Sequence, residues 1–349
     1  MREAMLYDRL ENDDVRCNLC ARRCLIKRGS LGFCRVRKNL NGKLYPLNYA
    51  KACSAIVDPI GKKPLSHFHP GALVMSIATV GCNFRCQFCD NWVISQEEEI
   101  TGRNIPPEKV IELTARYGAH GISYTYTEPT IFFEYAYDTA RLAHERGFFN
   151  TFVTNGYMTP EAVEAIAPYL DAATVDFKGG GDPEFYKRFS AVPSVEPIYE
   201  ALKEMKRRGI HIEVTNLVVP KFGDSMEMIS ELAAWIRENL SADTPFHLLR
   251  FHPDYKMNHI PSTEIKTLED AYEAAREAGL NYVYLGNVPG HRYENTYCPN
   301  CGEILIKRYG FEVIRWRITK EMRCLNCGTD IPIVGEYHKS GYSFPYPII

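Results

Sequence analysis

From about residue 71 onward, short apolar stretches alternate with longer stretches whose apolar residues recur at helical spacing. Met226, Ile229, Leu232 and Ile236, for example, follow the 3.6-residue period of a helix that Asp224 is predicted to cap. Strict alternation of this kind predicts a parallel sheet with helices outside it, which is an α/β fold. The predicted strands are 72–80, 121–126, 149–154, 172–177, 211–219, 246–251 and 282–285, and the predicted helices are 106–117, 130–145, 159–169, 183–189, 195–208, the helix after Asp224, and 266–278.

The first predicted strand leads directly into a loop with three closely spaced cysteines, Cys82, Cys86 and Cys89. Three thiolates can hold three irons of a [4Fe–4S] cube and leave the fourth iron without a protein ligand. A cluster that only carries electrons normally has four thiolates, so an incomplete set implies chemistry at the open iron. A zinc knuckle is the alternative, but no fourth cysteine lies close by in the sequence to complete it.

Phe88 stands directly before the last of these cysteines. The loop therefore resembles the C-x3-C-x-aromatic-C signature of radical S-adenosylmethionine (SAM) enzymes. Such an enzyme must hold the amino group, carboxylate, ribose and adenine of SAM against the open iron.

Polar residues follow several of the predicted strands, at the carboxyl ends where α/β folds place their reactive groups. Glu128 is suited to the amino group and resembles the Gly-Gly-Glu element of the family, although both glycines are replaced. Asn155 offers an amide at the level of the ribose. Asp176 and Lys178 resemble the Asp-x-Lys element of glycyl-radical activating enzymes, and the lysine is placed to pair with the SAM carboxylate. His252 is a candidate for contact with the ribose or the substrate. A surface histidine without a function is an equal alternative at this position.

Two further groups contain four cysteines each. Cys298, Cys301, Cys324 and Cys327 form paired Cys-x2-Cys-Gly knuckles, which predict a zinc ribbon with closed tetrahedral coordination, a rubredoxin-like iron site being the lesser alternative. Near the amino terminus, a second group has the spacing C-x2-C-x3-C-x9-C, which fits zinc or an auxiliary iron–sulfur cluster. Because this spacing is not that of a ferredoxin, it slightly favours zinc. The members of that group are Cys17, Cys20, Cys24 and Cys34.

Composition sets the class of protein. The 349 residues are 45% hydrophobic and 24% charged, as in a globular protein able to bury a core, and the net charge of −2 gives no reason to expect a nucleic-acid surface. No apolar run is long enough to cross a bilayer, and the first residues lack the pattern of a secretory signal, so we expect a cytoplasmic protein. Twelve cysteines in that reducing compartment indicate metal binding rather than disulfides.

Taken together, the cluster loop, the Asp-x-Lys element, both four-cysteine groups and the stretch Val57–Gly71 resemble the radical SAM member of the AmmeMemoRadiSam system. The resemblance covers nearly the whole chain, and a more distant one links it to pyruvate formate-lyase activating enzymes. It implies a partial (β/α)6 barrel over residues 71–290, with a four-cysteine segment at 1–70 and a zinc ribbon with a tail at 291–349. It also implies an electron donor of the ferredoxin or flavodoxin type and a Memo-like protein partner.

The leading hypothesis is thus an enzyme that cleaves SAM reductively at a [4Fe–4S] cluster. The products are methionine and a 5′-deoxyadenosyl radical, which takes a hydrogen atom from a substrate that the sequence does not identify. One rival is activation of a glycyl-radical protein. The additional ribbon favours this rival, because it indicates a substrate the size of a protein. RNA modification is a second rival, and the absence of a basic domain counts against it. A zinc-stapled binding scaffold without catalysis is the third.

Overall fold

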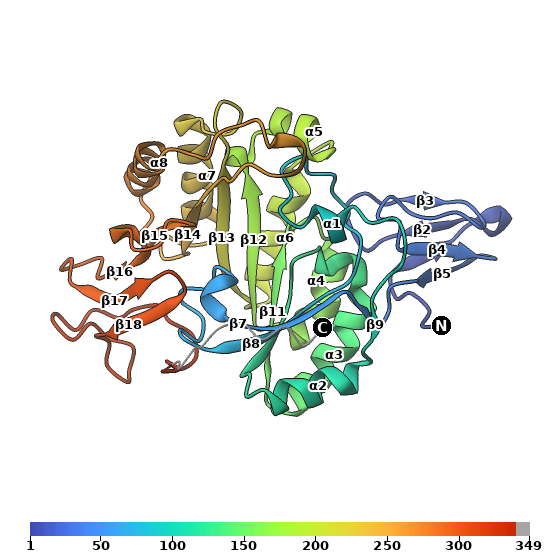
Figure 1. Cartoon of the computed structure of the whole chain (residues 1–349), viewed down its shortest axis with the longest axis horizontal. Coiled ribbons are helices and arrows are strands. Elements are labelled where there is room, and N and C mark those ends of the chain that lie inside the picture. Colours follow the sequence, from blue (N-terminus) through green and yellow to red (C-terminus); the bar gives the residue numbers. More distant parts are fainter. Residues whose placement is uncertain (340–349) are drawn as a thin grey trace.

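The computed structural model describes residues 1–339, so residues 340–349 of the predicted C-terminal domain lie outside the described part. Its centre is an eight-stranded sheet in the order β15-β14-β13-β12-β11-β10-β8-β7 (Figure 1). Strands β8 to β15 in this sheet are all parallel, whereas β7 is antiparallel to β8. The strands are β7 (Ser54–Pro59), β8 (Leu73–Ala78), β10 (Gly121–Tyr124), β11 (Phe149–Thr154), β12 (Ala172–Lys178), β13 (His211–Val218), β14 (Phe246–Arg250) and β15 (Val283–Gly286).

The α/β fold expected from the alternating pattern is confirmed, because each predicted strand region overlaps one of the parallel strands. The edge strand β7 comes from the stretch assigned by the sequence to the N-terminal segment, and it pairs with β8 from Ser54↔Ala78 to Pro59↔Leu73. The predicted domain boundaries stay predictions, but the central sheet begins before residue 71.

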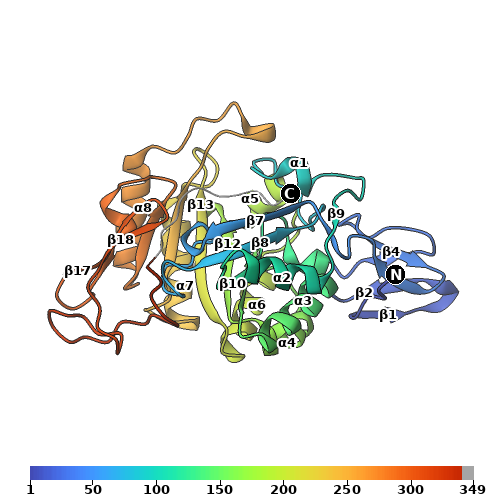
Figure 2. The same cartoon turned by 60° about the horizontal axis from the view of Figure 1, so that its bottom comes forward.

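Helices pack outside the sheet and bury their apolar sides against it, and Figure 2 shows α3, α4 and α6 grouped on the outer side of the strands. The predicted cap at Asp224 is wrong by one residue: the Ser225 hydroxyl accepts from the Met228 amide (3.3 Å), and Asp224 instead accepts from the Lys221 amide. The helices are α2 (Pro107–Arg116), α3 (Phe133–Glu145), α4 (Pro160–Ile166), α5 (Pro183–Ser190), α6 (Glu196–Arg207), α7 (Met226–Asn239) and α8 (Ile265–Glu277). Within residues 1–339, none of the helices combines the length and apolarity that a membrane crossing requires.

The N-terminal segment and the C-terminal ribbon lie at opposite ends of the molecule (Figure 1). A buried ion pair fixes the N-terminal segment to the barrel: the Arg37 guanidinium donates to both carboxylate oxygens of Glu134 in α3, at 2.7 and 2.9 Å. The strands of this segment are β1 (Tyr7–Arg9), β2 (Val15–Cys17), β3 (Leu25–Ile26), the hairpin β4 (Arg37–Leu40) with β5 (Lys43–Pro46), and β6 (Lys51–Ala52), which pairs with β9 (Arg103–Asn104).

The ribbon consists of β16 (Thr296–Tyr297), β17 (Ile304–Tyr309) and β18 (Glu312–Trp316) around a small apolar core. Arg308 of the ribbon donates to the carbonyl of Ser66 (3.0 Å). The amides of Ser66 and His67 in turn donate to the buried carboxylate of Glu213, at the start of β13. The ribbon is therefore anchored at the amino ends of the strands, away from the edge where the cysteine loop lies.

Candidate functional site

The loop with Cys82, Cys86 and Cys89 lies at the carboxyl end of β8 and runs into the short helix α1 (Trp92–Ser95). Two backbone hydrogen bonds hold it against the end of α5: the Arg85 amide donates to the Ser190 carbonyl (2.9 Å) and the Gln87 amide to the Phe189 carbonyl (2.8 Å). The loop is thus fixed in position by an element about a hundred residues away in the sequence.

Each thiol of the loop has a polar neighbour. The Phe84 amide donates to Cys82 Sγ (3.4 Å), and the hydroxyl of Ser190 lies 3.4 Å from Cys86 Sγ. The hydroxyl of Ser95 lies 3.2 Å from Cys89 Sγ. Hydroxyl and amide donors of this kind stabilise thiolates and tune iron–sulfur clusters. Nothing in the sequence pattern singled out the two serines, because their roles depend on contacts rather than on spacing.

The electrostatics of the loop favour a bound cation. Burial raises the pKa of the Cys82 thiol well above its usual range, and the nearby charges of Glu128 and Cys86 raise it further. Coordination to iron stabilises the thiolate form and opposes this rise. A donor set of three thiols on one loop, with Cys86 buried and the other two partly buried, therefore fits a cluster with three cysteine ligands.

Glu128 lies beside this loop, and both oxygens of its carboxylate accept hydrogen bonds from protein groups. Its Oε1 accepts from the amide and hydroxyl of Thr130 and from the hydroxyl of Thr154 (2.7 Å), and its Oε2 accepts from the Asn155 amide (2.8 Å). Burial raises the pKa of Glu128, and these hydrogen bonds oppose the rise. In this arrangement the carboxylate joins the loops after β10 and β11.

The two residues before Glu128 replace the glycines of the family element. Tyr126 adopts a φ of +64°, which lies in the left-handed region that favours glycine. The backbone conformation that glycine would supply is therefore kept with a tyrosine. The hydroxyl of Tyr126 donates to Asp58, whose carboxylate also binds the buried ammonium of Lys63 (2.7 Å). This polar cluster connects the Val57–Gly71 stretch to the loop that carries Glu128.

Asn155 connects the end of β11 to the cysteine loop. Its Nδ2 donates to Asn83 Oδ1 (2.7 Å), and its Oδ1 accepts from the Tyr157 amide (3.0 Å). Asn83 stands directly after Cys82, so the amide pair holds the loop in place.

Lys178 and Asp176 end β12 on the side of Cys86. Burial raises the pKa of the Cys86 thiol, and the Lys178 ammonium is the nearby charge that most opposes this rise. Lys178 Nζ donates to the carbonyl of Asp176 (3.0 Å), while the Asp176 carboxylate accepts from Thr215. The lysine is thus the predicted pocket residue whose charge favours a thiolate at Cys86.

Phe88 and His252 occupy different environments. Phe88 is buried and its ring lies 5.5 Å from that of Phe185 in α5, so it helps to fix the loop. His252 is exposed and lies two residues after the end of β14. The segment that follows it covers the loop, because the Tyr255 ring stacks on Trp92 at 5.0 Å and the Lys256 amide donates to the Gln87 carbonyl.

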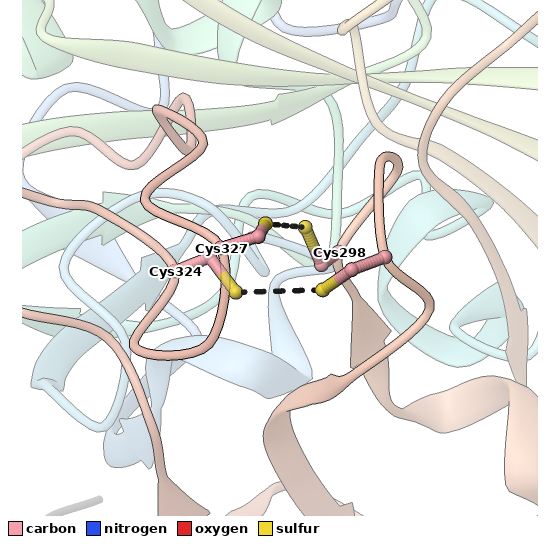
Figure 3. Close-up of side chains that lie close together, drawn as sticks. Cys298, Cys324 and Cys327 are labelled. Atoms are coloured by element: carbon pink, nitrogen blue, oxygen red, sulfur yellow. Dashed lines mark hydrogen bonds between the residues drawn. The ribbon is translucent and has the colours of Figure 1, made fainter.

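In the ribbon, the four sulfurs of Cys298, Cys301, Cys324 and Cys327 all lie within 4.8 Å of one another. Cys298 Sγ is 3.6 Å from Cys327 Sγ, and Cys301 Sγ is 3.8 Å from Cys324 Sγ (Figure 3). In a tetrahedron with metal–sulfur bonds of about 2.3 Å, sulfurs are about 3.8 Å apart. The ribbon is therefore shaped for a single tetrahedral metal ion.

The N-terminal cysteines also come together, around a cavity that Cys17, Cys20, Cys24 and Cys34 all line. Within residues 1–339, no group of three or more thiol, imidazole or carboxylate ligands outside the ribbon is as compact as its four sulfurs.

Comparison with known proteins relates residues 76–236 to the model of the Radical SAM superfamily. MJ0808, an uncharacterized protein of Methanocaldococcus jannaschii, is 49% identical over 337 residues, which are 96% of this chain and 100% of that protein. A pyruvate formate-lyase-activating enzyme of Clostridium pasteurianum is 24% identical over 53% of this chain and 82% of its own length. The crystal structure of a radical SAM methyltransferase from Sphaerobacter thermophilus superimposes with a TM-score of 0.48 and 17% identity, over 62% of this chain and 69% of the other.

Proposed function

We propose that this chain, whose residues 76–236 match the model of the Radical SAM superfamily, cleaves SAM at a [4Fe–4S] cluster held by Cys82, Cys86 and Cys89 and so generates a radical that abstracts hydrogen from a substrate. The observation that carries the proposal is a loop with three closely spaced thiols at the carboxyl end of β8, next to the charge of Lys178. When bound, the cluster and SAM supply one-electron cleavage of a sulfonium C–S bond, which gives methionine and the 5′-deoxyadenosyl radical.

The residues around the loop bind and orient SAM. Lys178 pairs with the SAM carboxylate, for which its position near Cys86 is suited. Glu128 acts as a positioning residue, because its oxygens hold the loops after β10 and β11 in register. Asn155 fixes the cysteine loop through Asn83, and it lies at the level where the ribose of SAM would bind.

The barrel also excludes water from the site of the reaction. Phe88 is 4% exposed, and the segment after β14 covers the loop through the stacked rings of Trp92 and Tyr255. Exclusion of water and oxidants protects a reactive radical from side reactions. His252 lies in the same segment and is exposed, so it is placed to contact the substrate.

A more specific assignment is the radical SAM member of the AmmeMemoRadiSam system, active in the cytoplasm. The stretch Val57–Gly71 supports it, since Asp58 and Lys63 from this stretch bind to each other and Asp58 also binds Tyr126 beside the pocket. The assignment includes zinc in the ribbon, an electron donor of the ferredoxin or flavodoxin type, and a Memo-like protein as partner. The ribbon sulfur distances support zinc.

The test is anaerobic reconstitution with iron and sulfide, followed by addition of SAM and dithionite. Formation of 5′-deoxyadenosine, measured by liquid chromatography and mass spectrometry, is expected for the wild type. Cys86→Ala serves as the inactive variant. Cys53→Ala, which removes a thiol outside all three cysteine groups, is the matched control and should retain the activity. Equal product from the wild type and Cys86→Ala would reject the proposed reaction, and purified protein with zinc but no iron would favour a binding scaffold.

A further inference from the structure

A single cavity in the N-terminal segment is lined by all four cysteines of that segment, Cys17, Cys20, Cys24 and Cys34. The centre of a water-sized sphere can occupy about 10 Å³ of this cavity. Leu19, Ile26 and Ile131 line the same cavity and are buried. Four thiols around an enclosed, largely apolar space are the donor set of a metal centre.

The size of the centre follows from a comparison with the ribbon of the same chain. A single tetrahedral ion requires sulfurs about 3.8 Å apart, and the ribbon sulfurs have this spacing. Elsewhere in residues 1–339, no three potential ligand atoms form such a compact group, and the four N-terminal cysteines instead share a cavity. A cube places irons and sulfides between the thiolates, and its cysteine sulfurs are farther apart than those around one ion.

The wall of the cavity also contains two N–H donors without an acceptor. Arg37 is 2% exposed and its Nε has no hydrogen-bond partner, although its two other nitrogens bind Glu134. Asn83 is fully buried, and its Nδ2 likewise has no partner. An unpaired buried donor is costly, and each such group calls for an explanation. Bridging sulfides and thiolates of a cluster would accept from both, and the charge of Arg22, which also lines the cavity, would offset the negative charge of the cluster.

From these observations we propose that Cys17, Cys20, Cys24 and Cys34 bind a second [4Fe–4S] cluster in which every iron has a cysteine ligand. This assignment replaces the slight preference for zinc that the cysteine spacing gave. It goes beyond the proposed SAM cleavage and does not depend on it.

The second cluster lies against the loop of the first. Arg22 Nε, from the cavity wall, donates to the Asn83 carbonyl (2.5 Å) within the cysteine loop. Gly81 touches the segment as well: a Cβ at this position would lie 3.0 Å from the Cys34 carbonyl oxygen and 2.7 Å from Val36. A cluster with all irons ligated carries electrons, and this one is in direct protein contact with the loop that holds the open iron.

The experiment compares metal content and spectra of full-length proteins purified without oxygen and reconstituted with iron and sulfide. The decisive variant replaces Cys82, Cys86 and Cys89 together by alanine, which removes the open cluster. It should retain about four irons and about four sulfides per chain, while the wild type holds about eight of each and about one zinc. After reduction, the variant should give the electron paramagnetic resonance signal of a [4Fe–4S] cluster, and addition of SAM should leave that signal unchanged.

The double variant Cys20→Ala/Cys24→Ala removes two ligands of the proposed second cluster and should halve the iron content of the wild type. Cys53→Ala is the matched control and should lose no iron. A triple variant that binds no iron would overturn the proposal. Two zinc ions per wild-type chain, with iron for a single cube, would do the same. Because the triple-variant measurement needs no SAM turnover, failure of the proposed enzymatic activity leaves this test intact.

Discussion

Glu134→Gln is expected to loosen the N-terminal segment from the barrel. Glu134 is fully buried in α3 and accepts from two nitrogens of Arg37, which is 2% exposed, and from the Met5 amide (2.9 Å). Glutamine has nearly the same shape but no charge. It also turns one of the two oxygens that face Arg37 into a donor, so the guanidinium loses both its counter-charge and one hydrogen bond.

The magnitude follows from the burial of the pair. Removing one partner of a buried ion pair costs about 3–5 kcal/mol, because the remaining charge is left without compensation. Since glutamine keeps one acceptor for Arg37, we expect the lower end, about 3 kcal/mol, which is a factor of roughly 100 in an equilibrium constant.

Hydrogen–deuterium exchange measured by mass spectrometry on the anaerobically purified protein reports this opening locally. Peptides that contain β4 and β5 should exchange roughly 100-fold faster in Glu134→Gln, while peptides of β12 and β13 keep their protection. The matched control is Glu161→Gln, which breaks the Arg23–Glu161 pair between the same segment and α4. That pair is 42% and 50% exposed, so its loss should cost only about 0–1 kcal/mol.

Replacement of both partners by methionine should restore much of the protection, since an apolar pair leaves no charge unpaired. The reasoning is refuted if Glu134→Gln and Glu161→Gln accelerate exchange equally, or if acceleration in Glu134→Gln spreads over the whole barrel.

Three further predictions concern charge and metal. Lys178→Met should raise the KM for SAM about 10–100-fold with a smaller change in kcat, because a charge-assisted hydrogen bond contributes about 1.5–3 kcal/mol; an unchanged KM in steady-state assays of 5′-deoxyadenosine would contradict its role. Burial raises the pKa of Glu134, but Arg37 and the hydrogen bonds bring it below its ordinary value, so the ion pair stabilises the folded state above about pH 4.3 and is lost as the pH falls through the lower folded value. The difference in urea midpoint between wild type and Glu134→Gln should therefore be full at pH 7 and shrink below about pH 4, and a difference that grows on acidification would be inconsistent with this sign. Chelation of the ribbon metal should confine new proteolytic cleavage to residues 291–339, because the ribbon core is small and separate from that of the barrel; cleavage within the strands of the barrel would count against this separation.

The alternation of apolar and amphipathic stretches was enough to predict the parallel sheet, because parallel strands are buried on both faces and leave a continuous apolar signal. β7 was missed for the opposite reason. It lies among cysteine-rich and loop-like residues and joins the sheet only by pairing with β8, from Ser54↔Ala78 onward. Such a pairing is a long-range contact, which local periodicity does not encode.

The four-cysteine group of the ribbon could be predicted, because ligand spacing is a local property of the sequence. The partners of the pocket residues could not. Ser190 reaches Cys86 across 104 residues, and Asn155 reaches Asn83 across 72. Glu128 was expected to face a ligand, but its oxygens accept from Thr154 and the Asn155 amide. Whether a polar side chain is free or engaged depends on which loops the fold brings together.

The central claim is that one iron of the cluster on the Cys82 loop is open to SAM. The most direct test is electron–nuclear double resonance of the reduced protein with SAM labelled by ¹⁵N at its amino group. A ¹⁵N coupling to the cluster is expected for the wild type, and it should be absent from Cys86→Ala. A reduced wild-type cluster that shows no coupling to labelled SAM would contradict the claim.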